Sequence, residues 1–267
     1  MTEPATTSVS TLAAAAVLEM AGVAVPVLRE PSRVQLDDVN WTVQRGDYWA
    51  LGGLLRSGKS DLLALAAGLT RPPRGVCRWF GQEVSGGFED EHLTLRRRVG
   101  FVFDGGRLLN DLTLAENVAL PLRYHLARGE AEPAERIAAL VSFTDLEPWA
   151  GQRPADVSRN WQQRFGLARA LALKPELLLL DDPLSGLDPR DAGWWIDTLE
   201  ALATGHTLLD GRPLTLVVSG NDLRPWREQA RQFALLQDRS FTVVGARDAL
   251  EASTQPVLME LLRPRRN

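Results

Sequence analysis

Residues 53–60 read Gly-Leu-Leu-Arg-Ser-Gly-Lys-Ser and match the phosphate-binding pattern G-x-x-x-x-G-K-[ST]. The residues before them, 48–52, have the apolar character of a short buried strand, and residues 60–68 have that of a helix that ends at glycine. A loop that joins a strand to a helix N-terminus presents free backbone amides and the positive end of the helix dipole, which together bind anions. The sequence therefore predicts nucleotide or phosphate binding at this loop, and the alternative is a chance match.

The lysine of this loop is unusual within the chain. Of the 30 lysine and arginine residues, only Lys59 and Lys174 are lysine. A compact ammonium fits between phosphate oxygens, where the broad, planar guanidinium of arginine would not. We therefore expect Lys59 to contact the β- and γ-phosphates. The residues predicted to surround the phosphates are Gly53, Leu54, Leu55, Arg56, Ser57, Gly58, Lys59, Ser60 and Asp61.

Two aspartates follow a run of four leucines at residues 177–180. Such a run is typical of a strand buried on both faces, whose carboxyl end is where ligands bind in open α/β sheets. We expect Asp181 to hold Mg²⁺, directly or through water, beside the Ser60 hydroxyl. Asp182 is then a candidate to orient or deprotonate an attacking water. The alternative is a turn, because Asp-Asp-Pro also has turn chemistry.

Composition narrows the class of protein. The 267 residues are 45% hydrophobic and 24% charged, which excludes a mainly disordered or fibrous chain. The net charge is −4, so no basic excess indicates a nucleic-acid partner. The single cysteine, Cys77, excludes an intramolecular disulfide and is expected in the core of a strand at 75–80. No apolar run reaches the roughly 18 residues of a membrane span, so work at a membrane would need a partner.

Strands and helices alternate along the chain, which predicts an α/β fold with a mainly parallel sheet. Residues 17–23 and 34–43 alternate as strands of an antiparallel sheet do. Residues 1–15 are expected to be a flexible lead-in, and helices are expected at 114–126, 132–141 and 160–173. Further strands are expected at 98–103, 214–218, 233–236 and 241–244.

The run at residues 165–189, Phe-Gly-Leu-Ala-Arg-Ala-Leu-Ala-Leu-Lys-Pro-Glu-Leu-Leu-Leu-Leu-Asp-Asp-Pro-Leu-Ser-Gly-Leu-Asp-Pro, resembles the ATP-binding subunits of ABC transporters. It is similar to that family's stretch from after the signature motif, through the Walker B strand, to the D-loop. The resemblance covers about residues 17–245 and implies one domain over 16–267 with a RecA-like P-loop NTPase core, an antiparallel β part and a helical subdomain at about 107–165. Residues 108–123 are most similar to the ATPases of MCE-type lipid transporters. The ATPases of lipoprotein-releasing transporters and amino-acid importers share part of this segment.

The chain departs from the family's pattern at positions that act on ATP. Arg56 stands where the phosphate loop usually carries glycine, and Asp104 replaces the Q-loop glutamine. Asp182 replaces the glutamate after the Walker B strand, and Asn221 falls on the switch histidine if 215–223 is aligned without a gap. The resemblance then implies the catalytic candidates Asp182, Asn221 and Asp104 and the metal-ligand candidates Ser60, Asp181 and Asp104.

The signature motif, Leu-Ser-Gly-Gly-Gln in the family, reads Val-Ser-Arg-Asn-Trp at residues 157–161. Ser158 keeps its hydroxyl and is expected to contact the γ-phosphate across a dimer. Arg159 and Asn160 replace glycines that allow close backbone approach. The aromatic residue that stacks on adenine would lie near Val27, where the sequence has none.

The resemblance implies a subunit that binds ATP and Mg²⁺, pairs with a polytopic membrane permease, and forms a homo- or heterodimer of ATP-binding subunits, with no nucleic acid. It implies a cytoplasmic protein that is peripheral on the inner face of the cell membrane. Two functions stay open. In one, ATP binding and hydrolysis energise or gate membrane transport, and the similarity of residues 108–123 favours lipids as the cargo. In the other, the altered motifs bind ATP with little hydrolysis and support or regulate a transport complex.

Overall fold

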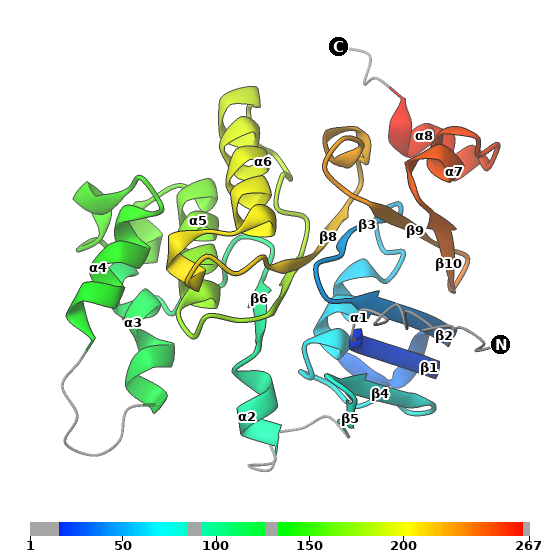
Figure 1. Cartoon of the computed structure of the whole chain (residues 1–267), viewed down its shortest axis with the longest axis horizontal. Helices are drawn as coiled ribbons and strands as arrows, with labels where there is room; N and C mark the ends of the chain where they lie inside the picture. The colour runs from blue at the N-terminus through cyan, green and yellow to red at the C-terminus, as the bar shows by residue number, and fades with distance from the viewer. Residues whose placement is uncertain (1–15, 85–91, 126–132, 264–267) are drawn as a thin grey trace, which may run out of the picture.

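The computed structural model describes residues 16–84, 92–125 and 133–263, so the predicted lead-in at 1–15 lies outside the described residues. Figure 1 shows a group of helices on one side, α3 (Leu114–His125), α4 (Ala134–Ser142) and α5 (Arg159–Leu171), and two sheets on the other. Helix α1 (Lys59–Ala66) lies close to both sheets, and one apolar cluster contains its residues together with residues of both sheets. The phosphate loop therefore joins a packed strand to a packed helix.

The central sheet has six strands in the order β10-β9-β3-β8-β7-β6. The strands β3, β6, β7, β8 and β9 pair in parallel, and β10 pairs antiparallel with β9 at one edge. This arrangement agrees with the mainly parallel sheet predicted from the alternation. Its strands are β3 (Tyr48–Gly52), β6 (Val99–Val102), β7 (Leu177–Leu180), β8 (Thr215–Gly220), β9 (Gln232–Gln237) and β10 (Ser240–Gly245).

The second sheet is antiparallel, with the order β2-β1-β4-β5. Its long strand β2 alternates buried and exposed residues toward its end, as expected for a sheet with one covered face. Its strands are β1 (Ala16–Val27), β2 (Glu30–Gln44), β4 (Val76–Trp79) and β5 (Gln82–Glu83).

Along the chain, the helices α3, α4 and α5 lie between β6 and β7, and α6 follows β7. Trp195 on α6 is fully buried, while the indole of its neighbour Trp194 lies under the guanidinium of Arg164 at 4.0 Å and donates to Asp145. Among the residues described, no helix combines the length and apolar character needed to cross a membrane. The helices are α2 (Leu93–Arg96), α3 (Leu114–His125), α4 (Ala134–Ser142), α5 (Arg159–Leu171), α6 (Pro189–Thr204), α7 (Arg247–Glu251) and α8 (Pro256–Leu262).

The only cysteine gives a simple test of the core. Cys77 lies in β4, is 3% exposed, and has its thiol pKa raised by burial to about 12. At pH 8 the thiol therefore stays protonated, and the thiolate is the reactive form. We expect a thiol reagent such as Ellman's reagent to leave the native protein unlabelled and to label the urea-unfolded protein rapidly. Fast labelling of the native protein would show that β4 is not packed as described.

Candidate functional site

The two glycines of the motif occupy positions where a side chain would not fit. Gly58 precedes α1 with φ 100°, and a Cβ there would lie 2.7 Å from Cγ of Gln35. A Cβ on Gly53 would lie 2.4 Å from Oγ of Ser57. The loop therefore closes tightly over the start of α1, and its backbone amides are left to face a ligand.

The ammonium of Lys59 is buried at the centre of this loop, with the residue 7% exposed. It donates hydrogen bonds to the carbonyl oxygen of Gly53 at 2.6 Å, to that of Leu54 at 3.0 Å, and to Oδ1 of Asn221 at 2.9 Å. Burial lowers the pKa of Lys59, and the carboxylates of Asp182 and Asp181 oppose that shift. A charged donor is thus held where the motif predicts phosphate oxygens.

Arg56, which stands where the resemblance places a glycine, has a left-handed backbone conformation. Its φ is 63°, in the left-handed region that costs a residue with a Cβ about 1–2 kcal/mol. The side chain itself is exposed. Arginine is therefore tolerated sterically at this position but strains the loop.

Replacing Arg56 by glycine should relieve this strain. Glycine loses about 0.5–1 kcal/mol more backbone entropy on folding, so we expect Arg56→Gly to raise the free energy of unfolding by about 0.5–1 kcal/mol. The matched control is Leu55→Gly, because Leu55 is also exposed but is not among the described residues with positive φ. Urea unfolding should show stabilisation for Arg56→Gly and destabilisation for Leu55→Gly. Equal destabilisation of both variants would show that the backbone at Arg56 is not strained.

Asp181 follows β7 at the edge of the sheet that faces the loop and is 5% exposed. Burial raises the pKa of its carboxyl, and hydrogen bonds with Ser60 and Ser219 act in the opposite direction. No group of three or more acidic, cysteine or histidine side chains that could enclose a metal occurs among the described residues. Mg²⁺ does not require one, because it is commonly held by one or two carboxylates together with phosphates and waters. The oxygen donors of Asp181 and Ser60 fit that chemistry.

Asp182 and Asn221 are in contact beside Lys59. Nδ2 of Asn221 donates to Oδ2 of Asp182 at 3.0 Å, while Oδ1 of the same amide accepts from Lys59. Asn221 thereby connects the phosphate loop to the end of β7. Asparagine can hydrogen-bond both groups, but it cannot change its charge as histidine can.

Asp104 lies after β6, and its carboxylate is paired with the guanidinium of Arg159 in the same chain. Two of the residues that depart from the family's pattern, one at the Q-loop and one in the signature motif, therefore contact each other. The pair is partly exposed, at 41% for the aspartate side chain and 62% for the arginine, so it contributes little to stability. The pair has a local effect, because the positive charge of Arg159 offsets the negative charge of Asp104, a predicted metal ligand.

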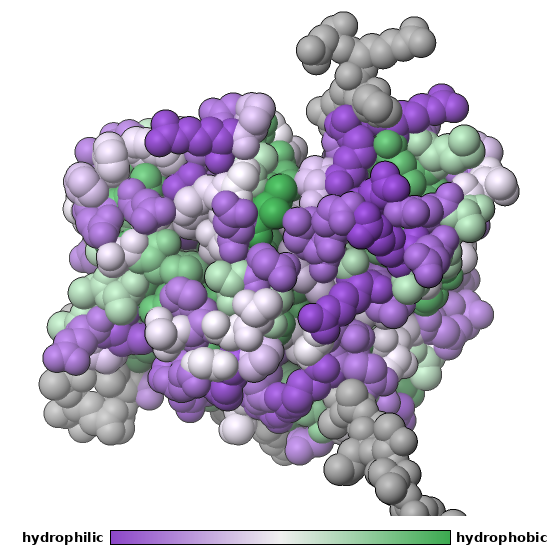
Figure 2. Space-filling model, turned by 45° about the horizontal axis from the view of Figure 1, so that its top comes forward, coloured by the Kyte–Doolittle hydropathy of each residue, from purple (hydrophilic) through white to green (hydrophobic). Residues whose placement is uncertain are grey.

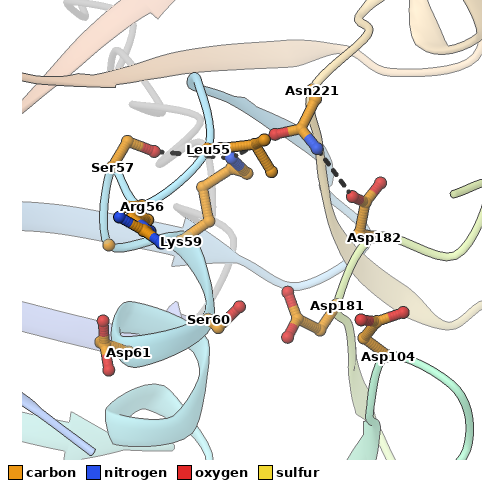
Figure 3. A pocket seen from close by; sticks show the side chains of 11 residues that line it. Leu55, Arg56, Ser57, Lys59, Ser60, Asp61, Asp104, Asp181, Asp182 and Asn221 are labelled. Atoms are coloured by element: carbon orange, nitrogen blue, oxygen red, sulfur yellow. Dashed lines mark hydrogen bonds between the residues drawn. The ribbon is translucent and has the colours of Figure 1, made fainter.

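Figure 3 shows how these side chains face one cavity, with Lys59 and Asn221 in the upper part of the view and Asp181 and Asp104 below them. Asp61 points to the far side of α1 in this view, and its Oδ1 accepts from the backbone N–H of Leu28 at 2.8 Å. The cavity has a volume of about 180 Å³ and is lined by Leu55, Arg56, Ser57, Gly58, Lys59, Ser60, Asp61, Asp104, Asp181, Asp182 and Asn221.

Three of the predicted residues are not part of this lining. Gly53 and Leu54 contribute their carbonyl oxygens to Lys59 instead. Ser158 is exposed at the start of α5, where its Oγ accepts from the backbone N–H of Trp161 at 3.3 Å. A contact of Ser158 with a phosphate would thus have to be made to a second subunit, as the resemblance implies.

The sequence reasoning missed Ser219, which is fully buried in β8. Its hydroxyl contacts both aspartates, by accepting from the backbone N–H of Asp182 at 3.1 Å and donating to Oδ1 of Asp181 at 3.1 Å. The available signal was a hydroxyl residue directly after the apolar run 214–218. The pairing of strands, which the sequence does not state, decides what that hydroxyl touches.

A family model described as ABC transporter matches residues 36–185. A dimeric ATP-binding cassette, solved in a post-hydrolysis state with ADP and Pi, superposes with a TM-score of 0.72 at 28% identity, covering 84% of this chain and 95% of that one. The predicted α/β P-loop NTPase fold of the ABC ATPase type is confirmed.

The relatives found are named for a cargo other than the lipid predicted for this chain. The methionine import ATP-binding protein MetN of Bifidobacterium longum is 30% identical over 223 residues, which are 83% of this chain and 54% of that protein. MetN of Rhizobium johnstonii is 39% identical over 155 residues, 58% of this chain and 42% of that protein. The chain spans about half the length of these relatives. Both are methionine import proteins, so the finer likeness to MCE-type lipid transporter ATPases is not supported.

Proposed function

Because this chain belongs to the ABC transporter family, we propose that it is the MgATP-binding subunit of a membrane transporter and that it hydrolyses ATP slowly. The observation that carries the proposal is Lys59, whose buried ammonium lies in a glycine-bounded loop opposite Asp181. Backbone amides and Lys59 would bind the phosphates, and Ser60 with Asp181 would hold Mg²⁺. The metal would neutralise phosphate charge in that position.

Slow hydrolysis is supported by the groups around the reacting phosphate. One carboxylate oxygen of Asp182 accepts from Asn221, and this neutral amide cannot supply or accept a proton as an imidazole does. In the signature segment, side chains stand where glycines would let the backbone approach a second subunit's phosphate. The competing function, turnover with Asp182 as general base, is supported by the position of Asp182 in the cavity lining.

A groove beside the site supports a membrane partner. It lies among β6, α3 and α5, with Phe101, Phe103 and Pro121 among its apolar residues and Arg97 and Arg107 among its basic ones. Leu109 and Leu120 in its lining are 51% and 37% exposed. Figure 2 shows hydrophobic areas interspersed over the helical part, while the side with the C-terminal strands and helices is more hydrophilic. An amphipathic cytoplasmic helix of a polytopic permease, with acidic residues on its polar face, would fit this groove and hold the chain at the inner face of the membrane.

Charged residues in the groove should break this association. We expect Leu109→Asp combined with Leu120→Asp to abolish co-purification with a polytopic membrane protein, because the helix would then have to bury two unpaired carboxylates. The matched control is Val243→Asp with Met259→Asp, since these side chains are 46% and 44% exposed away from the groove. A tagged pull-down in which both pairs retain the membrane protein would place docking elsewhere. Recovery of soluble proteins alone by the wild type would contradict the transporter proposal itself.

The cargo is tested on the complex of this chain with its membrane partner. Residues 108–123 favour a lipid, whereas the relatives described above are methionine import proteins. In proteoliposomes that contain the complex, ATP-dependent movement of labelled phospholipid supports the lipid cargo. Movement of labelled methionine without phospholipid movement would contradict it.

A further inference from the structure

The buried hydroxyl of Ser219 joins the two acidic residues at the end of the parallel sheet. Ser219 is 0% exposed and lies in β8, next to Val218, which pairs with Leu180 of β7. Continuing that parallel register brings Ser219 beside Asp181. On the other side of β8, Ser219 pairs with Leu51 and Gly220 pairs with Gly52, so the same residues adjoin the start of the phosphate loop.

The hydroxyl uses both of its hydrogen-bonding abilities at once. It accepts from the backbone N–H of Asp182 and donates to Oδ1 of Asp181, each at 3.1 Å. An accepted hydrogen bond polarises a hydroxyl and strengthens the one that it donates. Asp182 also has φ 45°, a left-handed conformation that is unfavourable for a residue other than glycine. The hydrogen bond from its N–H to Ser219 helps to hold the backbone in this conformation.

A serine is not needed here for packing alone. Its neighbours along the strands, such as Leu179 and Val217, belong to an apolar cluster, and a buried hydroxyl is costly there unless it is bonded. Alanine has nearly the same size and would fill the position without that cost. The hydroxyl is therefore explained by the two aspartates that it contacts.

We propose that Ser219 is a positioning residue that fixes the direction of the Asp181 carboxylate and the backbone of Asp182, and that Mg²⁺-dependent nucleotide binding depends on it. The inference rests on the proposed function, since Asp181 is the metal ligand proposed there. Residues that orient a metal ligand typically account for about 10- to 100-fold in metal affinity. Ser219 would act through Asp181 without touching the nucleotide.

The test compares nucleotide affinity with and without Mg²⁺. Calorimetry with the nonhydrolysable analogue AMP-PNP, in Mg²⁺ and in EDTA, gives the gain in affinity that the metal provides. We expect Ser219→Ala to reduce that gain about 10- to 100-fold while leaving the affinity in EDTA unchanged, and Ser219→Thr to restore it. The matched control is Thr215→Val, which removes another buried hydroxyl of β8, one that accepts from the N–H of Gly46 at 3.0 Å.

The outcomes separate the inference from the function on which it rests. A full Mg²⁺ gain in Ser219→Ala, or an equal loss in Thr215→Val, would overturn the role of Ser219 and leave the proposed function intact. Wild-type protein that binds AMP-PNP without any Mg²⁺ gain would overturn the metal site and this role together. If Ser219→Ala does not fold, Ser219→Cys keeps the side-chain shape with a weaker donor, and a full gain in that variant would equally overturn the inference.

Discussion

Lys59→Ala should lose ATP binding almost completely. The change removes the buried charge that the phosphates would meet, and truncating one partner of a buried charged hydrogen bond costs about 2–5 kcal/mol. That range corresponds to a loss in affinity of between about 30-fold and a few thousand-fold. Calorimetric titration with MgATP measures it directly.

The chain contains its own control for this experiment. Lys174 is the only other lysine, and its ammonium pairs with Asp210 at 2.7 Å on the surface. Lys174→Ala should therefore bind MgATP as the wild type does. Equal affinities for wild type and Lys59→Ala would show that the phosphate site is elsewhere, and equal losses in both variants would indicate a general effect of removing a lysine.

Restoring the family's residues should raise ATP turnover by a large factor. The variant combines Asp182→Glu and Asn221→His with Arg159→Gly and Asn160→Gly. General-base and phosphate contacts each typically contribute about 10²-fold or more to such rates. Because these groups act on one phosphate, we expect the combined gain to exceed the product of the single gains. Steady-state phosphate release from wild type, single and combined variants measures it.

Two results would contradict this expectation in different ways. A high wild-type rate that falls with Asp182→Asn would identify Asp182 as the catalytic carboxylate and defeat slow hydrolysis. A low wild-type rate that the combined variant leaves unchanged would place the defect outside these motifs, and Arg56 with its φ of 63° would be the next residue to change.

The fold was predictable because its signals are local. The phosphate-loop spacing, the leucines of β7 and the alternation in β1 and β2 each follow from a few neighbouring residues, and the parallel sheet follows from their order. The same holds for Lys59 and Asp181, whose positions are set by the strand and helix that carry them. Exact strand ends differed by a few residues, as in β8, which continues to Gly220.

The contacts between distant segments were not predictable in this way. Ser219 meets Asp181 only because β7 and β8 are neighbours, and the sequence order places α6 between these two strands. Asp104 and Arg159 were each read as an isolated departure from the family, whereas the structure pairs them. Asp61 lines the cavity with the other residues of the motif, but its hydrogen bond from the N–H of Leu28, 33 residues away, was not predicted.

If the site binds ATP and hydrolyses it slowly, the nucleotide that the protein holds after a short incubation is ATP rather than ADP. Wild-type protein is incubated with equimolar MgATP, freed of unbound nucleotide, quenched in acid and analysed by chromatography, with Lys59→Ala as the empty-site control. We predict that the wild type retains nucleotide, that it is recovered as ATP, and that Lys59→Ala retains none. Recovery mainly of ADP with released phosphate from the wild type would contradict slow hydrolysis, and no retained nucleotide at all would contradict ATP binding at this site.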